Sequence, residues 1–225
     1  MNGDKLNLPF DYPTEEVESK IGFKFNEDLY GYDRIIPLRS MKFVKRMAYF
    51  ERDTFEALIR NIPLRGDPSV YPYKKARIEV FGREPKGCDV GQTFILESKL
   101  ISLICDVEQT FSRFFVKGLS KMPPVTVYGA DANGEKAMAF YIPPIIEIHQ
   151  NQAVILDGIH RNCVCKGAGT TINSVHISEV DVPLPFDIIR WKDTQVMKEK
   201  PSIEQRYVNL RKEYFRHLGA IGIDG

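Results

Sequence analysis

The sequence has 225 residues, 43% of them hydrophobic and 27% charged, which is typical of a globular chain with enough apolar side chains to fill a core. Its formal net charge of +1 argues against nucleic-acid binding through overall charge alone. No apolar run is long enough to span a bilayer, and the first ten residues contain no signal-peptide core, so we expect a cytoplasmic protein without a membrane partner.

The first part of the chain combines an aperiodic start with a basic segment. Residues 1–33 are polar and aromatic without a clear period, and we expect them to form an arm that lies on the domain. A strand is predicted at residues 34–39, and a helix begins at Asp53 as N-cap and ends at Pro63. The basic segment 34–65 is interpreted as a solvated surface or as one that faces phosphate or an acidic partner. Its cations are Arg34, Arg39, Lys42, Lys45, Arg46, Arg52, Arg60 and Arg65.

The middle of the chain is predicted to contain a long helix followed by a hairpin. After a strand at residues 76–81, apolar residues recur at helical spacing over residues 94–116, and we interpret this stripe as core. The Asn-Gly pair at 133–134 lies between the apolar runs 124–128 and 137–142, which is a strong hairpin signal.

A second hairpin and a short helix follow. Residues 144–149 and 153–156 are predicted to pair, residues 160–166 to form a helix, and residues 173–182 to form a further strand. Ser202 is expected to cap a C-terminal helix.

Strands and helices alternate irregularly, which predicts the α+β class. We expect an N-terminal arm at 1–33, one domain at 34–182 that contains the inserted long helix, and a helical extension at 183–225.

The segment Asp157-Gly-Ile-His-Arg-Asn162 follows the apolar run 154–156 directly and begins the short helix. A helix start presents unpaired N–H groups and the positive end of the macrodipole, so it favours anions. Gly158 allows a sharp turn, Arg161 carries planar donors suited to phosphate, His160 can donate, and Asp157 can cap the helix or hold a metal ion. The predicted phosphate contacts are Gly158, Ile159, His160, Arg161 and Asn162.

This motif resembles the Asp-Gly-His-His-Arg or Gly-Cys-His-Arg signature of the ParB/sulfiredoxin superfamily, which also lies between a strand and a helix. Residues 144–158 resemble the hairpin that precedes the signature, and residues 36–38 and 55–62 more loosely resemble the opening strand and helix. The resemblance implies a ParB/sulfiredoxin-like mixed sheet with packed helices. It also implies that Gly158, His160 and Arg161 contact nucleotide phosphates.

Departures from the known members narrow the expected activity. Ile159 stands where sulfiredoxins have their catalytic cysteine, so reductase chemistry is not expected. Residues 183–225 do not match the helix-turn-helix region of the partitioning proteins. The free-serine kinases are closest in motif form, and they use a glutamate between the first strand and first helix as a base. Glu51 occupies that place, although its connection from Arg39 is longer than expected.

We therefore expect a nucleotide-binding phosphotransferase or nucleotide hydrolase that uses ATP or ADP, or CTP, together with Mg²⁺ held through Asp157. His160 and Arg161 would stabilise charge on the transferred group. Glu51 or Glu147 would accept the proton of a small polar acceptor.

Other interpretations remain open at this point. The chain could be a non-catalytic, nucleotide-gated module of ParB type that binds DNA or a protein through residues 39–65. A DNA-cleaving enzyme ranks last, because no carboxylates cluster at two-metal spacing. The motif could be a plain strand-to-helix turn in which Arg161 pairs with a surface acid, and Glu147 could be a solvated strand residue.

The cysteines offer weaker candidates. A zinc site would combine His160, Cys163 and Cys165 with His149 or His176, but the spacing matches no usual ligand pattern. Cys163 as a nucleophile would need a lowered pKa. We expect reduced, buried thiols instead.

Overall fold

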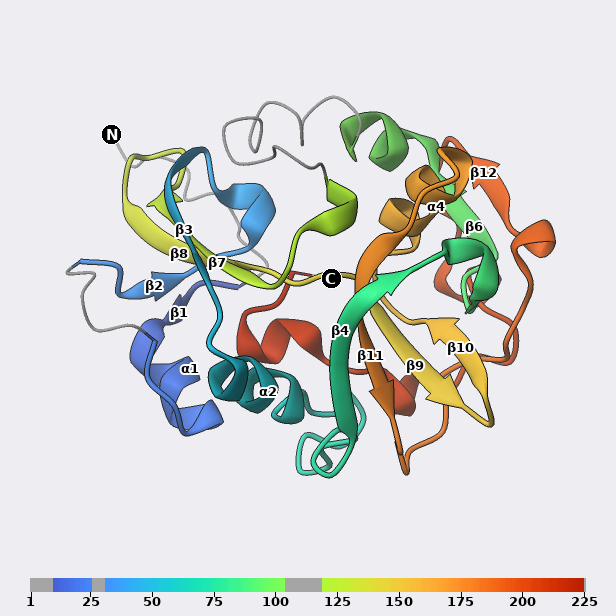
Figure 1. Ribbon diagram of the computed structural model, residues 1–225, viewed down its shortest axis with the longest axis horizontal. Coiled ribbons are helices and arrows are strands. Elements are labelled where there is room, and N and C mark those ends of the chain that lie inside the picture. Colours follow the sequence, from blue (N-terminus) through green and yellow to red (C-terminus); the bar gives the residue numbers. More distant parts are fainter. Residues whose placement is uncertain (1–9, 26–30, 104–118, 225) are drawn as a thin grey trace. The chain divides into compact units, whose positions relative to one another are not determined.

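The computed structural model describes residues 10–25, 31–103 and 119–224, which are drawn in colour in Figure 1. They form an α+β structure with two compact units. The first contains Met1–Asn61, Pro124–Tyr141 and Leu218–Gly225, and the second contains Ile62–Pro123 and Ile142–His217. The sequence-based domain 34–182 therefore contributes to both units.

The first unit is built on a five-stranded sheet with the order β1-β2-β8-β7-β3 (Figure 1). Its strands are β1 (Tyr12–Pro13), β2 (Arg34–Ile35), β3 (Phe43–Tyr49), β7 (Val125–Ala130) and β8 (Lys136–Tyr141), and its helices are α1 (Thr14–Ile21) and α2 (Arg52–Arg60). Strand β3 and helix α1 were not predicted from the sequence.

The predicted hairpin of the first unit is confirmed as β7 and β8. Its turn is stabilised by Asp131, whose carboxylate accepts hydrogen bonds from the N–H groups of Asn133 and Glu135. Gly134 has a φ of 79°, a conformation that glycine adopts without strain.

Helix α2 confirms the predicted amphipathic segment, with Phe55, Leu58 and Ile59 buried. The predicted N-cap is wrong. Glu51 is the N-cap, with extended backbone angles, and Asp53 lies inside the first turn, where its charge favours the positive helix end.

The second unit contains a five-stranded sheet with the order β4-β11-β9-β10-β5 (Figure 1). The sheet is mixed, as expected, because β9 is antiparallel to β10 and parallel to β11. Its strands are β4 (Arg77–Arg83), β5 (Asp89–Val90), β9 (Ile145–His149), β10 (Gln152–Ile155) and β11 (Ile172–Ser178). Helix α4 (Ile159–Gly167) confirms the predicted short helix.

The predicted long helix begins later than expected. Residues 94–96 form strand β6 (Phe94–Leu96), which pairs with β12 (Gln195–Met197), and residues 97–103 are helical. A three-residue apolar run fits either structure, and pairing with a distant strand decides it. Residues 104–116 of that prediction lie outside the described residues.

The predicted C-terminal helix is wrong. The capping box at Ser202 forms, but it opens only the 3-10 turn η5 (Ile203–Gln205), and a second 3-10 turn, η6 (Lys212–Tyr214), follows. The chain instead follows an irregular path because Tyr207 and Phe215 pack with Phe186 on a small core around Val154. No helix among the described residues is long and apolar enough to cross a membrane.

Candidate functional site

The β9–β10 hairpin delivers the motif to the start of α4. Gln150 and Asn151 form its turn with φ values of 49° and 67°, left-handed conformations that favour such a tight connection. Beyond β10, the N–H groups of Leu156 and Asp157 both donate to the carbonyl of Ile145, at 2.9 and 3.3 Å. These hydrogen bonds hold the chain to β9 as far as Asp157, the residue before the N-cap of α4.

Gly158 is the N-cap of α4 and has a φ of 79° and a ψ of 27°. A Cβ atom at this position would lie 2.8 Å from the Cβ and Cγ atoms of Pro144 and 3.0 Å from Nη2 of Arg161. Both the backbone conformation and the space therefore require glycine.

Arg161 is fixed under the helix start by two hydrogen bonds. Its Nη2 donates to Oδ2 of Asp157 at 3.0 Å, and its Nη1 donates to the carbonyl of Ile142 at 2.6 Å. The side chains of Arg161 and Asp157 are only 15% and 17% exposed. Arg161 is thus paired with an acid beside the helix start, in a setting partly shielded from water.

His160 is a neutral side chain that joins α4 to β6. Its Nε2 accepts a hydrogen bond from the backbone N–H of Leu96 at 3.0 Å, so the ring proton is on Nδ1. Burial lowers the pKa of His160 to about 4, and the ammonium groups of Lys99 and Lys200 add to this effect. At neutral pH the ring can donate from Nδ1, but it carries no positive charge.

The remaining two predicted contacts have buried side chains. Ile159 belongs to the core. Asn162 is completely buried, and its Nδ2 donates to the carbonyl of Gly158 at 3.0 Å. These two residues can offer a ligand only backbone groups, while their side chains stabilise the turn.

Two charged residues near His160 were not predicted. Lys99 and Lys200 are close enough to His160 to act on its pKa, and they come from residues 97–103 and from the segment after β12. Burial also raises the pKa of Tyr207. The charge of Arg65 acts to lower this pKa, and the charge of Asp157 acts to raise it. No local pattern identifies these residues, because they are brought to the motif only by tertiary contacts.

Glu147 is completely buried, so the interpretation of a solvated strand residue is wrong. Its Oε1 accepts from Nε of Arg216 at 2.7 Å and from the hydroxyl of Tyr73, and its Oε2 accepts from Nη2 of Arg216 and from His149. Burial would lower the pKa of Arg216, but the carboxylate of Glu147 raises it above its usual value. The network joins β9 to the C-terminal segment.

Glu51, the other candidate base, belongs to the first unit. It is exposed at the N-cap of α2, and its side chain does not cap the helix. This carboxylate is therefore open to solvent, whereas the carboxylate of Glu147 is held by a buried cation.

Metal and thiol chemistry find little support at the motif. Among the residues that the structure describes, no group of three His, Cys, Asp or Glu side chains could hold a metal ion. Burial raises the pKa values of Cys163 and Cys165, which opposes the thiolate form that a nucleophile or zinc ligand requires. Asp157 could contribute to a Mg²⁺ site only together with phosphate oxygens and water.

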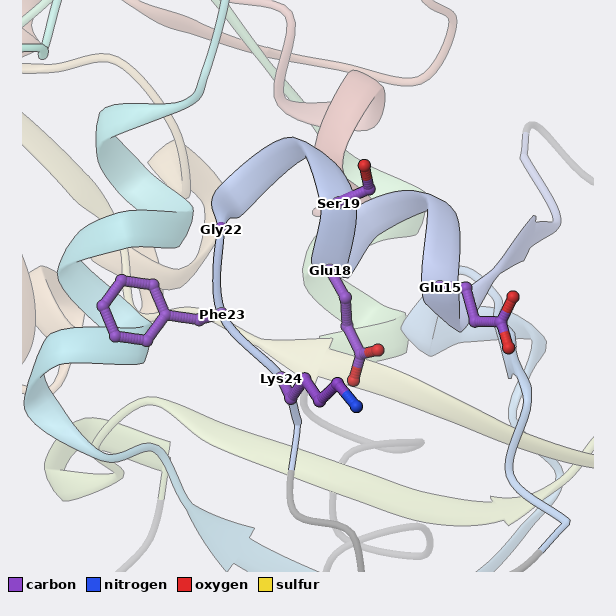
Figure 2. Close-up of a pocket in the computed structure, with 6 residues that line it drawn as sticks. All are labelled: Glu15, Glu18, Ser19, Gly22, Phe23 and Lys24. Carbon is purple, nitrogen blue, oxygen red and sulfur yellow. The ribbon is translucent and has the colours of Figure 1, made fainter.

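A separate hollow lies beside α1 in the first unit, with a volume of about 380 Å³ (Figure 2). Glu15 and Glu18 line it together with Lys24, and Glu18 also accepts a hydrogen bond from the N–H of Phe25 at 2.7 Å. Two carboxylates on an exposed helix repel phosphate, so this hollow is no competitor for a nucleotide site.

Comparison with family models, with curated proteins and with solved structures found no match for this chain.

Proposed function

We propose that residues 157–162 bind the phosphates of a nucleotide, and that the chain is a phosphotransferase or nucleotide hydrolase with a ParB/sulfiredoxin-like core. The observation that carries the proposal is the glycine turn at Gly158. Gly158 is a left-handed residue between a strand and a nine-residue helix, and the first N–H groups of a helix, which have no partner within it, are the donors that a phosphate site uses.

The charges around this turn support an anionic ligand. Lys99 and Lys200 are close enough to His160 to act on its pKa, so two cations add to the positive end of the helix dipole. Asp157 is paired with Arg161 at 3.0 Å, so these two charges offset each other. The local field therefore favours a phosphate group although the whole chain carries a charge of only +1.

Each motif residue would have a distinct role. The N–H groups of residues 159–161 would bind phosphate oxygens, and Nδ1–H of His160 would donate as a neutral group. Arg161 would stabilise charge on the transferred group, with its orientation set by Asp157 and by the carbonyl of Ile142. Mg²⁺, when bound, would neutralise phosphate oxygens, with Asp157 as its one predicted protein ligand.

Of the two candidates for the general base, Glu51 is the one with an exposed carboxylate. A general base needs a carboxylate that can accept the hydroxyl proton of a small polar acceptor. Glu147 cannot do so without breaking two hydrogen bonds from buried Arg216, at 2.7 and 2.8 Å. Glu51 is exposed and free of that constraint.

A thermal-shift panel with ATP, ADP, CTP and GTP, each with Mg²⁺, tests the proposal. A ligand that binds the native state raises the melting temperature as its concentration passes the dissociation constant. Arg77→Ala serves as the matched control for Arg161→Ala, because Arg77 is also paired with an acid in the second unit but is 64% exposed. No shift with any nucleotide, in wild type and control alike, would overturn the proposed function.

A non-catalytic, nucleotide-gated binding module is the second candidate. It shares the phosphate site and differs in having no turnover. The cations along β3, which form no ion pair with another described residue, favour it.

A further inference from the structure

Strand β3 is an edge strand with an open side. It pairs with β7 alone, at the end of the order β1-β2-β8-β7-β3 (Figure 1). Within the described part of the chain, no backbone group of residues 43–49 bonds to a segment on its other side. Such edges are exposed to other molecules unless charged side chains discourage strand pairing.

The charge on this edge is of one sign. Residues 34–50 contain no Asp or Glu, and Lys42, Lys45 and Arg46 are all exposed. None of these three cations forms an ion pair with another described residue. By contrast, Arg39 in the same segment is paired with Asp224 at 3.1 Å.

Acidic residues gather at the opposite edge of the same sheet. Asp11 lies beside β1, and Glu15, Glu16 and Glu18 lie on α1, which follows β1 directly. The sheet order places β1 and β3 at its two ends. Asp11 and Glu16 are ion-paired with Arg34 and Lys20, whereas the three cations along β3 form no ion pair with a described residue.

Two aromatic side chains extend from the basic strand into solvent. Phe43 is 65% exposed and Tyr49 is 78% exposed. Each exposed ring offers a flat apolar face on which another ring can stack. The strand spans about 20 Å between them, at about 3.3 Å per residue.

We propose that the edge formed by β3 binds single-stranded nucleic acid. Lys42, Lys45 and Arg46 contact the phosphates, and Phe43 and Tyr49 stack on bases. This combination of a basic track and aromatic platforms is what sequence-tolerant binding of single strands requires. An acidic peptide or an anionic membrane would use the cations but has no bases to stack on the rings.

A bulge in β3 fits this role. The pairing register with β7 shifts between Val44 and Arg46, so Lys45 is the additional residue. A bulge increases the local twist of an edge strand and redirects its side chains. By its register Phe43 lies opposite Ala130 and Tyr49 opposite Val125, so the rings extend from opposite faces of the sheet. A strand that follows the edge meets one ring from each face.

Fluorescence anisotropy with the full chain tests the proposal, using labelled oligo-dT and oligo-rU of about 15 nucleotides and a DNA duplex of the same length. The first variant is Lys42→Gln/Lys45→Gln/Arg46→Gln. Its matched control removes three exposed lysines of the second unit, as Lys75→Gln/Lys86→Gln/Lys192→Gln. We expect the first variant to lower the salt slope by about 2, because each phosphate contact on a single strand contributes about 0.7.

The aromatic contribution has its own pair of variants. Tyr49→Ala should weaken binding by about fivefold or more, as expected for loss of one stacking platform. Tyr71→Ala, at an exposed tyrosine of the second unit, should leave binding unchanged. Comparison of oligo-dT with oligo-rU shows whether DNA or RNA is preferred, and either result supports the proposal.

Several outcomes would overturn it. The first is that neither single strand binds at low salt. The second is that the β3 variant and its charge control lose the same affinity for the oligonucleotides. The third is that the duplex binds as tightly as the single strands and that Tyr49→Ala has no effect. Binding to anionic vesicles or to polyglutamate in place of the oligonucleotides would assign the edge to another partner. Loss of oligonucleotide binding in Arg161→Ala, with the β3 variant unaffected, would assign it to the nucleotide site.

Discussion

Arg216 binds both carboxylate oxygens of Glu147, with Nε to Oε1 at 2.7 Å and Nη2 to Oε2 at 2.8 Å. The two residues are 69 positions apart in the chain, and both are buried. The remaining hydrogen bonds of Arg216 go to the carbonyls of Val182, Pro183 and Tyr214. A single cation thus holds the C-terminal segment against β9, the strand that precedes the candidate site.

Arg216→Ala should lower the free energy of unfolding by about 3–5 kcal/mol, because it leaves a buried carboxylate without its cation. Urea denaturation of the variant measures this loss. The double variant Arg216→Met/Glu147→Leu should recover much of it, since apolar residues of similar volume remove the uncompensated charge. Arg77→Ala, which breaks an exposed pair with Glu79, should lower stability by less than about 1 kcal/mol. Equal effects of Arg216→Ala and Arg77→Ala would contradict the structural role of the network.

The stability of the protein should fall in mild acid because of two histidines. Burial lowers the pKa values of His160 and His176 to about 4, against about 6.5 in an unfolded chain. Between these values the unfolded state binds more protons, so the free energy of unfolding decreases as the pH falls from about 6.5 to about 4. The slope is at most about 1.4 kcal/mol per pH unit for each histidine, and partial solvation of the rings reduces it.

His176→Phe isolates one of these contributions. The ring of His176 stacks on Phe81 at 3.7 Å between centroids, and neither of its nitrogens makes a well-formed hydrogen bond to a described residue. Phenylalanine should keep the packing and remove up to half of the pH slope, as measured by urea denaturation between about pH 4.5 and 7. An unchanged slope in His176→Phe would show that this histidine does not titrate as stated.

Local signals in the sequence predicted the two hairpins and the short helix of the candidate site. The Asn-Gly turn at 133–134 and the polar turn at 150–152 both identify hairpins, because turn chemistry and alternating apolar residues act over a few positions. Helix α4 was predicted for the same reason. A glycine that follows a buried strand and precedes helix-compatible residues predicts a turn that leads into a helix.

Features that depend on distant pairing could not be predicted. The burial of Glu147 depends on Arg216, and the strand conformation of residues 94–96 depends on β12. Lys99 and Lys200 approach His160 only after those contacts form. Single-sequence patterns contain no information on which distant segment supplies a partner, so charge and burial at these positions stayed undetermined.

Gly158→Ala should destabilise the protein and abolish nucleotide binding. It adds a Cβ atom 2.8 Å from Pro144 to a residue whose φ is 79°. Gly134→Ala is the matched control, because Gly134 has the same φ of 79° but no atom within 4 Å of its added Cβ. The control should lose about 1–2 kcal/mol from backbone strain alone, and Gly158→Ala should lose more. Calorimetric titration and urea denaturation measure the two effects, and equal losses would show that Pro144 is not in the way.

Arg161→Ala should weaken nucleotide binding strongly and also reduce stability. The side chain holds Asp157 and the carbonyl of Ile142, at 3.0 and 2.6 Å, so its removal frees two acceptors. Arg161→Lys keeps the charge but cannot form both planar contacts, and it should bind nucleotide less well than wild type and better than Arg161→Ala. Calorimetric titration on the folded variants is the measurement. Unchanged affinity in Arg161→Ala would contradict the proposed phosphate contact.

The assignment of the base separates an enzyme from a binding module. Glu51→Gln should lower the rate of phosphate transfer by about 10²–10⁴-fold and leave nucleotide affinity unchanged, because a base acts on the acceptor and not on the bound nucleotide. Asp53→Asn removes an exposed carboxylate two residues away and should retain full activity. Glu147→Gln should lose stability, because it leaves buried Arg216 without its counter-charge.

Transfer is measured with labelled nucleotide against amino acids, sugars, protein and water as acceptors. Slow turnover with normal affinity in Glu51→Gln alone supports the kinase-like assignment. Slow turnover in a folded Glu147→Gln protein, with Glu51→Gln at the wild-type rate, would move the base to β9, despite its contacts with Arg216. A wild-type protein that binds nucleotide but transfers phosphate to none of these acceptors is a binding module. The phosphate site at Gly158 then controls the binding of a partner and does not catalyse a reaction.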